Sequence, residues 1–513
     1  MLLKVLGVGL YLAILLVIGV IASRKTRDVR EYFAAGKKLG FWSVAFSARA
    51  TGESAWLLLG LTGMGAAIGV QAFWVVLGEL VGVGGAWLLM CRRFHRLTQR
   101  YDSITVPDYL ESRFRDTSHM LRIVAATTLV VFVAIYVSAQ IDATGTAFES
   151  FLGWNYFLGA AVGFGVVLAY IVSGGFVAVV WSDVFQGAMM FLGLVTLPIV
   201  GLIAAGGWEP VAAGIRAQDP GLLSIWGPDG LSAMTIATTL GLALIGLGFL
   251  GSPQVFVRFL ALKSEREIPK GAAVAIVWTI LADSGAVLIG IIGRHLLAGP
   301  GDELVQVLGQ GGQNVLSMSV DLLLPAFLVG LYIAVVLAAT MSTVDSLLVV
   351  ASSAFVRDFW QRVRHPELSD RSLIGMSRIA TFILAIAAFA IAMVVAITSE
   401  ERTIFWFVIF GWSGIAATFC PTIILSLFWS GFTRRGALTA MVSGFACIPL
   451  FKFAAPAIPG VGPYFNGLEE LAPSFLVSGT LGVVVSLLDK AGRERLADVR
   501  AELEAASTGE ASQ

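Results

Sequence analysis

Charged residues are scarce in this sequence. Only 13% of its 513 residues are Asp, Glu, Lys or Arg, about half the share in a typical soluble protein. Hydrophobic residues make up 57%, and the mean hydropathy is +0.85. The formal net charge is zero, so nothing indicates a nucleic-acid partner. We therefore expect lipid to be the main solvent of this chain.

Cysteine and histidine are scarce as well. Cys91, Cys420 and Cys447 are isolated in the sequence, which predicts neither a disulfide framework nor a thiolate metal site. The four histidines are scattered, which disfavours a His-rich metal site. No histidine shares an apolar segment with acids at ligand spacing, so we expect no enzyme activity and no cofactor beyond a coupling ion.

Long apolar segments recur along the whole chain. A helix needs about 20 mainly apolar residues to cross a bilayer, and an open strand cannot satisfy its backbone in lipid. The sequence therefore predicts an all-α polytopic membrane protein with about thirteen transmembrane helices. These helices are expected near residues 2–23, 42–63, 70–91, 121–147, 154–174, 180–205, 232–253, 270–295, 318–352, 374–397, 403–429, 436–456 and 470–489.

Basic residues gather in alternate loops. The stretches 24–41, 92–122, 263–270, 357–378, 434–435 and the tail after 489 hold 27 of the 34 Lys and Arg residues. Loops rich in Lys and Arg stay in the cytoplasm. We therefore expect a multi-pass protein of the cell inner membrane with its N-terminus outside. The first apolar segment is too long for a signal-peptide core, so we interpret it as a retained helix.

The tail at residues 490–513 is short. It leaves no room for a signalling domain, which disfavours a membrane sensor without transport. We expect residues 1–489 to form one membrane transport domain and 490–513 a cytoplasmic tail. No obligate protein partner is evident in the sequence.

Two apolar segments are interrupted at corresponding positions. The second holds Arg49, Gly52 and Glu53, and the seventh holds closely spaced glycines followed by Pro253. Broken helices five segments apart are typical of an inverted five-plus-five repeat with a binding site at mid-membrane. We expect core repeats at about 42–205 and 232–429, with broken first and sixth core helices. Helix 1 and residues 436–489 are expected at the periphery.

Ionisable side chains within apolar segments need a partner or a role, because each costs about 2.5–3.5 kcal/mol to insert. For Arg49, Glu79, Arg258 and Asp283 we favour pairing inside the protein or a place near a helix end. Arg49 and Glu53, for example, have the i, i+4 spacing of one helix face.

The ninth segment carries four oxygen-bearing side chains close together. Ser342, Asp345 and Ser346 share one helical face, and Thr343 points about 100° away. Such hard oxygen donors suit a small alkali cation. The alternative is that these hydroxyls only bond carbonyls one turn back. Asp183 could complete an ion site or could cap a helix start.

Five sequence motifs lie at Ser54–Leu61, Asp102–Tyr109, Gly174–Asp183, Pro253–Phe259 and Ala339–Thr343. Together they resemble the sodium:solute symporter family, and its sodium/proline branch in particular. The family has a core of two inverted five-helix repeats with an added N-terminal helix, which agrees with the predicted segments. The resemblance implies sodium-coupled symport of a small organic solute by alternating access.

The resemblance also implies sodium ligands. The principal site would use the backbone carbonyls of Ala50, Glu53 and Ala339 with the side chains of Ser342 and Thr343. Some family members hold a second sodium, and its counterparts here are Asp183, Ser342, Asp345 and Ser346. A carboxylate at 345, where small hydroxyls are usual, could strengthen a second cation site or could carry a proton.

The substrate is less closely defined by the resemblance. The proline branch implies contacts from Trp56, Tyr136 and Phe249. Acidic Glu53 and Asp142 near the cavity suggest a substrate with a cationic end, unless they pair with Arg49. Proline or another amino acid is the leading prediction. The alternatives are a sodium- or proton-coupled symporter of an amine, a sugar or a carboxylate.

Overall fold

The computed structural model describes residues 2–23, 35–365, 367–399 and 404–508, and all regular elements in these ranges are helical. The predicted all-α class is therefore confirmed. The basic residues predicted in a cytoplasmic loop at 24–30 lie outside the described ranges.

The first half of the chain includes two long helices, α8 and α9. Two helices, α3 and α9, each contain a residue with non-helical backbone. The bounds in this half are α1 Leu2–Ser23, α3 Phe41–Ala55, α4 Thr62–Ile68, α5 Phe73–Gly85, α6 Cys91–Arg100, α7 Val106–Phe114, α8 Met120–Leu152, α9 Tyr156–Ala204, α10 Trp208–Gln218 and α11 Ala233–Leu244.

The second half begins with a short helix and ends in the tail. Its bounds are α12 Pro253–Leu260, α13 Ile268–Leu297, α14 Leu304–Leu308, α15 Val315–Leu323, α16 Ala326–Ser353, α17 Asp370–Thr398, α18 Ile404–Phe428, α19 Arg434–Pro449, α20 Gly462–Leu468, α21 Leu471–Leu488, α22 Lys490–Arg495 and α23 Val499–Thr508. Three linking stretches matter for the site: η2 Trp56–Leu61, η6 Ile245–Leu250 and η9 Ala354–Arg364.

Eleven of the described helical runs are long and apolar enough to cross a membrane. One of them, Phe41–Arg100, has 60 residues, far more than the roughly 20 that one crossing requires. Helix α9 has 49 residues and is interrupted at Gly175, so each of its two parts approaches or exceeds the length of one crossing. The exact number of thirteen therefore stays a prediction.

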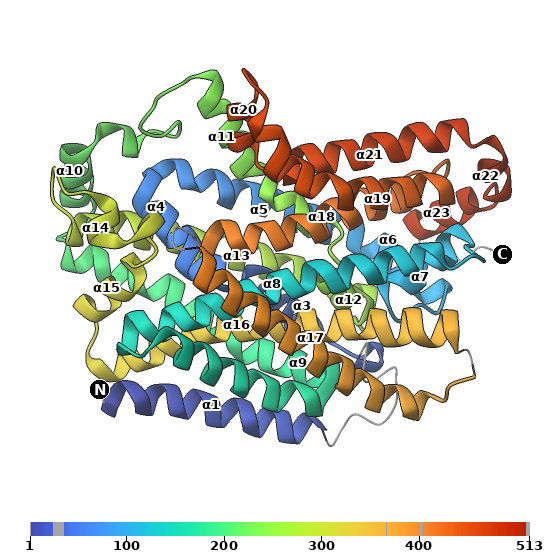
Figure 1. The fold of residues 1–513 in the computed structure, drawn as a ribbon, viewed down its shortest axis with the longest axis horizontal. Coiled ribbons are helices and arrows are strands. Elements are labelled where there is room, and N and C mark those ends of the chain that lie inside the picture. The colour runs from blue at the N-terminus through green and yellow to red at the C-terminus, as the bar shows by residue number, and fades with distance from the viewer. Residues whose placement is uncertain (1, 24–34, 366, 400–403, 509–513) are drawn as a thin grey trace.

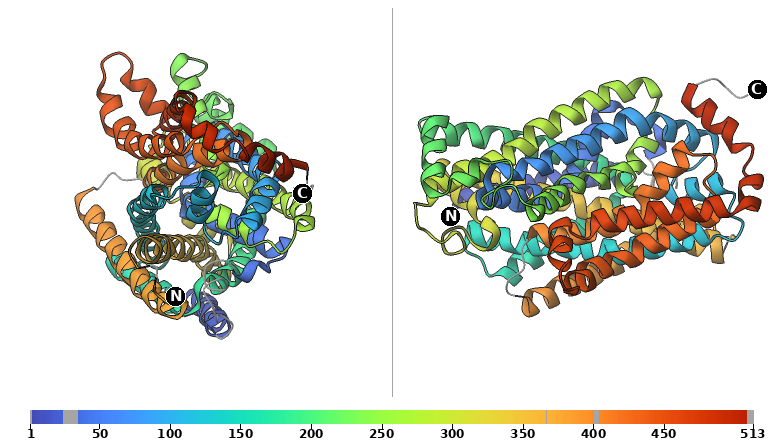
Figure 2. Two further views of the ribbon diagram at one scale, coloured as in Figure 1. Left: turned by 90° about the vertical axis from the view of Figure 1, so that its right-hand side faces the viewer. Right: turned by 90° about the horizontal axis from the view of Figure 1, so that it is seen from above.

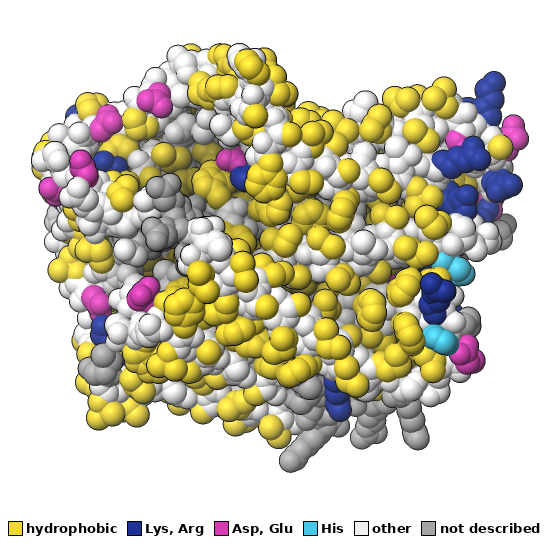
Figure 3. Space-filling model, in the orientation of Figure 1, with side chains coloured by type: hydrophobic (Ala, Val, Ile, Leu, Met, Phe, Trp, Pro, Cys, Tyr) yellow, Lys and Arg dark blue, Asp and Glu magenta, His cyan; other side chains and the backbone are white. Residues whose placement is uncertain are grey.

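Buried helices occupy the middle of the bundle and apolar surfaces its outside. The long helices run roughly along the horizontal axis of Figure 1, with α1 and α21 on opposite sides in both Figure 1 and Figure 2. Helices α16 and α18 are mostly buried, whereas α1, α19 and α21 are mostly exposed. Hydrophobic side chains cover the middle of the visible face, and Lys and Arg gather at the end with α6, α22 and α23 (Figure 3). This distribution is that of a protein embedded in lipid.

Two broken helices pass through the centre, as the sequence predicted. Helix α3 is interrupted at Ser54, whose φ of 54° and ψ of −166° are non-helical. Helix α11 continues into the 3₁₀ turn η6, and the chain changes direction at Gly251 and Ser252 before α12 begins at Pro253. Proline at the first helical position suits this restart because its missing N–H would be unpaired there. Helix α3 packs against α16, and η6 packs against α18.

Candidate functional site

The break in α3 lies directly against α16. The hydroxyl of Ser342 donates to the carbonyl of Ala50 at 3.0 Å, and the hydroxyl of Thr343 donates to the carbonyl of Thr51 at 3.1 Å. Both hydroxyls also lie 3.2 Å from the carbonyl oxygen of Ala339. Two side-chain and three backbone oxygens from two helices are thereby brought together in a fully buried place.

The local sequence explains why α3 can offer carbonyls here. In a continuous helix the carbonyl of Thr51 would accept from the N–H of Ala55. That N–H instead donates to Oε1 of Gln140 on α8, at 2.9 Å. Ser54 takes a backbone conformation that is costly for a residue with a Cβ. Such strain persists where the surrounding structure enforces it, typically at binding sites.

Most residues predicted for the principal sodium site meet in the structure. Ala50, Ala339, Ser342 and Thr343 supply four of the five oxygens described above. The fifth, the carbonyl of Thr51, was not predicted, because the resemblance assigned the carbonyl ligands of this segment to Ala50 and Glu53. For Glu53 the backbone carbonyl was predicted as a ligand, and this stays a prediction; its side chain forms an ion pair with Arg49.

The residues predicted for a second sodium surround a guanidinium group. Arg258 on α12 lies 2.8 Å from Oδ2 of Asp183 and also donates to the hydroxyl of Ser346 at 2.5 Å. It further reaches the hydroxyls of Ser47 at 2.7 Å and Thr51 at 2.6 Å. A positive charge of the protein itself therefore occupies the space between Asp183 and Ser346. The predicted pairing of Arg258 inside the protein is confirmed.

Asp345 lies at the edge of this group. One of its oxygens accepts from Ser346 at 3.2 Å, and the other is 3.4 Å from the hydroxyl of Ser182. Ser342, which was predicted to join both sodium sites, contacts the carbonyls of Ala50 and Ala339. The structure thus groups Asp183, Asp345 and Ser346 around Arg258, with Ser342 on the principal site.

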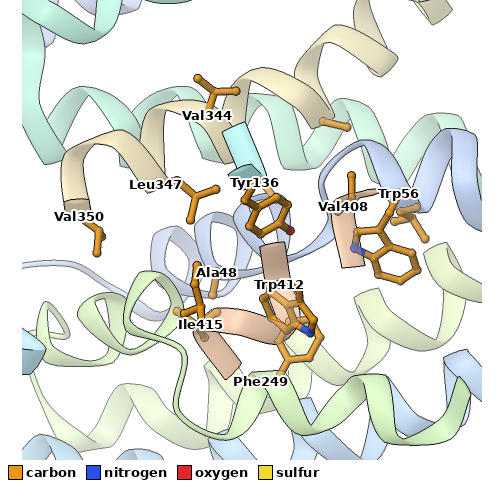
Figure 4. Packing of buried hydrophobic residues seen from close by; sticks show 14 of the residues in the cluster. Ala48, Trp56, Tyr136, Phe249, Val344, Leu347, Val350, Val408, Trp412 and Ile415 are labelled. Atoms are coloured by element: carbon orange, nitrogen blue, oxygen red, sulfur yellow. The ribbon is translucent and has the colours of Figure 1, made fainter. Parts of the chain in front are cut away.

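Two of the three aromatic residues predicted to contact substrate are linked by a third ring. Trp412 on α18 lies between Tyr136 and Phe249, with ring centroids 6.4 Å and 4.9 Å away (Figure 4). Its Nε1 donates to the carbonyl of Ile245 in η6 at 3.2 Å. Trp56 stands apart in Figure 4, and its ring packs edge-on against Phe405 at 6.0 Å. Trp412 was missed by sequence reasoning, because one tryptophan in an apolar helix carries no specific signal.

The two predicted acidic substrate contacts have different surroundings. Glu53 is fully buried beside Arg49. Asp142 accepts a hydrogen bond of 2.6 Å from the hydroxyl of Tyr156. It lines a cavity of about 520 Å³ together with Glu149 and Gln313. The structure therefore does not join Glu53 and Asp142 in one group.

The two ends of the bundle differ in how open they are. The 520 Å³ cavity lies near α14 and α15, and a neighbouring cavity of about 210 Å³ extends it towards Gly60 and Phe405. At the opposite end, the cavity between Pro107, Phe176 and Ser353 measures only about 20 Å³. The described structure is thus hollow at one end and nearly closed at the other.

A buried ion-pair network covers the closed end. Arg122 at the start of α8 contacts Asp108 at 2.7 Å, Asp358 at 2.6 Å and also Glu111. Arg357 lies 3.3 Å from Asp108. Burial by itself would raise the pKa of Asp108, but Arg122 and Arg357 outweigh this effect and hold its pKa below the ordinary value. The network ties α7, α8 and η9 together.

Known proteins similar to this chain are solute transporters. A high-affinity proline transporter, PutP of Bacillus subtilis, is 34% identical over 485 residues, which cover 94% of this chain and 98% of that protein. A sodium/proline symporter of Escherichia coli is 31% identical over 94% of this chain and 92% of its own length.

Solved structures share the fold at low sequence identity. A Na⁺-coupled sialic acid symporter, in a substrate-bound outward-open state, superposes with a TM-score of 0.78 at 17% identity and covers 95% of this chain and 97% of that one. The nucleobase-cation-symport-1 family transporter MHP1 gives a TM-score of 0.54 at 12% identity, with 91% and 95% covered. These likenesses agree with the predicted inverted-repeat core.

The family assignment rests on most of the chain. Residues 32–444 match the sequence model of the sodium:solute symporter family. The family predicted from the motifs is therefore confirmed, and the protein is a membrane transporter and not an enzyme. The chain belongs to the sodium:solute symporter family.

Proposed function

We propose that this protein couples the inward movement of sodium to the uptake of proline. The names of the similar proteins in Bacillus subtilis and Escherichia coli support proline as the solute. The proposed location is the cell inner membrane with the N-terminus outside, because Lys and Arg gather at the end that carries α6, α22 and α23 (Figure 3). The hollow end would then face the outside.

One observation carries the sodium proposal. The hydroxyls of Ser342 and Thr343 lie 3.0 and 3.1 Å from carbonyls at the break of α3, and 3.2 Å from the carbonyl of Ala339. A hydroxyl has two acceptor lone pairs, so each can turn from donating to a carbonyl to facing a cation. Five neutral, hard oxygens fit a monovalent alkali ion. Ala50, Thr51, Ala339, Ser342 and Thr343 are thus the residues that would hold it.

The surroundings of Phe249 suit a solute with an apolar ring. Tyr136, Trp412 and Phe249 form a continuous aromatic surface (Figure 4). Gly52 lies directly beside Phe249, since a Cβ on Gly52 would be 2.6 Å from the Phe249 ring. The backbone at the break of α3 is thereby close to the aromatic surface. This arrangement supports joint binding of proline and sodium on either side of α3.

The ion also provides a means of coupling. It would bridge α3 of the first repeat and α16 of the second, so it favours the state in which these helices are close. A change from 1:99 to 99:1 between two states requires about 5.5 kcal/mol of differential binding. A membrane potential adds about 2.3 kcal/mol per charge per 100 mV. The free energies of sodium binding and of the membrane potential together are of the size needed to drive alternating access.

Transport in proteoliposomes tests the proposal. Purified protein should accumulate labelled proline when sodium is present outside and should fail to do so when choline replaces sodium. Ser342→Ala and Thr343→Ala should each lose most of the sodium-dependent uptake. Ser352→Ala is the matched control, since the Ser352 hydroxyl bonds only a carbonyl of its own helix among the contacts described, Val349 at 3.1 Å.

The same preparation separates the alternatives. Equal uptake in sodium and choline, together with a dependence on an inward proton gradient, would contradict sodium coupling. Absence of proline counterflow would contradict proline as the solute. A thermal-shift screen of amines, sugars and carboxylates with sodium would then identify the ligand, because a bound ligand stabilises the folded state.

A further inference from the structure

A second group of buried oxygens lies away from the principal sodium site. Glu53 on α3, Glu79 on α5 and Asp283 on α13 each contribute a carboxylate oxygen, and these oxygens lie within 4.8 Å of one another. All three side chains are at least 99% buried. Helix α13 packs against both α3 and α5, so the group joins the two predicted repeats.

Arg49 contacts one oxygen of each acid. Its guanidinium lies 3.1 Å from Oε2 of Glu79 and 3.5 Å from Oδ2 of Asp283, and it pairs with Oε1 of Glu53. The second oxygen of each acid is buried and receives no hydrogen bond from a donor group of the described residues, although the carboxyl groups of Glu79 and Asp283 lie close enough to share a proton. Three oxygens from three helices thus remain available to a further ligand.

The charges in this group do not balance. Three carboxyl groups face one guanidinium, and Glu79 also lies near the phenol of Tyr136. The hydrogen bond between Glu79 and Asp283 requires one proton, so the excess is one negative charge, and burial of unpaired charge is strongly unfavourable. The guanidinium of Arg49 also lies over the rings of Phe249 and Trp278, at 5.0 and 5.2 Å. The unpartnered oxygens and the excess charge both indicate a missing cation.

We infer that Glu53, Glu79 and Asp283 bind a second sodium ion, distinct from the one proposed at Ser342 and Thr343. The inference rests on the proposed function, which supplies sodium as the transported ion. Oxygens up to 4.8 Å apart suit a hard cation with ligands at about 2.3–2.6 Å, the range known for oxygen-bound Ca²⁺.

Two other ligands agree less well with the geometry. An organic amine would have to fit among three carboxylate oxygens that lie within 4.8 Å of one another and that Arg49 already contacts. A proton shared by Glu79 and Asp283 reduces the charge but does not reach Glu53, whose second oxygen stays without a hydrogen-bond partner. A metal ion satisfies the charge and the unpartnered oxygens together.

Occupancy of this site would influence the substrate surface through Arg49. The guanidinium contacts all three carboxylates and also lies over the ring of Phe249. A cation among the carboxylates would repel Arg49 and change how firmly it holds the Phe249 ring. The site would therefore couple sodium to proline by a route separate from the carbonyls of Ala50 and Thr51.

Binding of ²²Na⁺ to the purified full-length protein tests the inference. Wild type should bind about two ions per chain, and uptake should depend on sodium with a Hill coefficient approaching two. Glu79→Gln and Asp283→Asn preserve side-chain shape and reduce the excess charge, so folding should be retained. Each should bind about one ion, with a Hill coefficient near one. Glu470→Gln is the control, since Glu470 is a buried carboxylate paired with Lys452 elsewhere.

The outcomes separate this inference from the proposed function. One ion in wild type that is lost in Ser342→Ala but kept in Glu79→Gln would overturn the second site and leave sodium symport intact. An unchanged ion count in both acidic variants, with altered activity only between pH 6 and pH 8, would assign a proton to the cluster and also overturn it. No bound sodium in wild type would overturn both.

Discussion

Arg122 and Asp358 form a buried ion pair that joins α8 to η9, with Nη1 of Arg122 2.6 Å from Oδ1 of Asp358. The two side chains are 6% and 0% exposed. Asp358 also accepts from Thr105 at 3.0 Å, next to the start of α7. Because this network covers the nearly closed end of the bundle, we expect it to hold the solute path shut on the side that we propose to be cytoplasmic.

Arg122→Gln is expected to open that end. Removal of one partner from a buried pair costs about 3–5 kcal/mol, which is comparable with the free energy that separates two transport states. A cysteine at Ser353, which lines the small cavity, should react with a maleimide at least ten times faster in this variant. The background should carry Cys447→Ser, since Cys447 is the partly exposed cysteine.

Arg500→Gln provides the control for this experiment. Arg500 forms an exposed i, i+4 pair with Glu504 in the tail, and such pairs contribute little to stability. An equal labelling rate in wild type and Arg122→Gln would show that the network does not hold this end closed.

Acid should weaken the same network through Asp108. The pKa of Asp108 is below its ordinary value in the folded protein, so ionisation of this residue favours the folded state. That contribution is fully present above the ordinary pKa of about 3.9 and is lost as pH falls through the lower folded pKa. The thermal unfolding midpoint should therefore be steady from pH 7 to 5 and should fall below pH 4.

Asp108→Asn supplies the comparison for this pH dependence. The variant should be less stable at pH 7, because Arg122 and Arg357 lose a charged partner. Its loss of stability below pH 4 should be smaller than that of wild type. Parallel acid curves for the two proteins would assign the acid sensitivity to other carboxylates.

The positions of the helix breaks could be read from the sequence because their signals are local. Gly52 beside ionisable Glu53, and the glycines before Pro253, mark places where an apolar helix cannot continue unchanged. The structure confirms breaks at Ser54 and at Gly251. The Ser342 and Thr343 face was predictable for the same reason, since its residues are neighbours on one helix.

The partners across helices could not be read in this way. Arg49 and Glu53 share one helix, and their pairing was predicted, but Glu79 and Asp283 join them from α5 and α13. Gln140 on α8 accepts a hydrogen bond at the α3 break. Trp412 on α18 packs against the ring of Phe249. These contacts depend on the packing of helices that are far apart in the sequence. The spacing of residues along the chain does not predict that packing.

Gly52→Ala should impair proline binding more than sodium binding. The added Cβ would lie 2.6 Å from a ring carbon of Phe249, so the ring must move. Overpacking of a buried site costs about 1–3 kcal/mol, which corresponds to a rise in the KM for proline of roughly 5- to 150-fold. Uptake kinetics at saturating sodium measure this effect. Gly165→Ala is the control, because its Cβ would meet no atom within 4 Å.

Arg258 and Asp183 should behave as a coupled pair in stability measurements. Arg258→Gln leaves Asp183 buried without its 2.8 Å partner, and the expected loss is about 3–5 kcal/mol. Asp183→Asn in the same chain removes the uncompensated charge. The double variant should therefore unfold at a higher temperature than Arg258→Gln alone. Additive losses would mean that the two residues do not stabilise each other.

Trp412→Phe should lower the affinity for proline without a large loss of stability. The phenyl ring keeps most of the packing against the tilted ring of Phe249, but the hydrogen bond from Nε1 to the carbonyl of Ile245 is lost. That bond fixes η6 against α18, and a hydrogen bond of this kind contributes about 0.5–1.5 kcal/mol. We expect the KM for proline to rise by about 2- to 13-fold, with sodium dependence unchanged. Trp429→Phe is the control, since Trp429 stacks on Phe432 at the edge of the bundle. An equal KM in wild type and Trp412→Phe would mean that the position of η6 does not depend on Trp412.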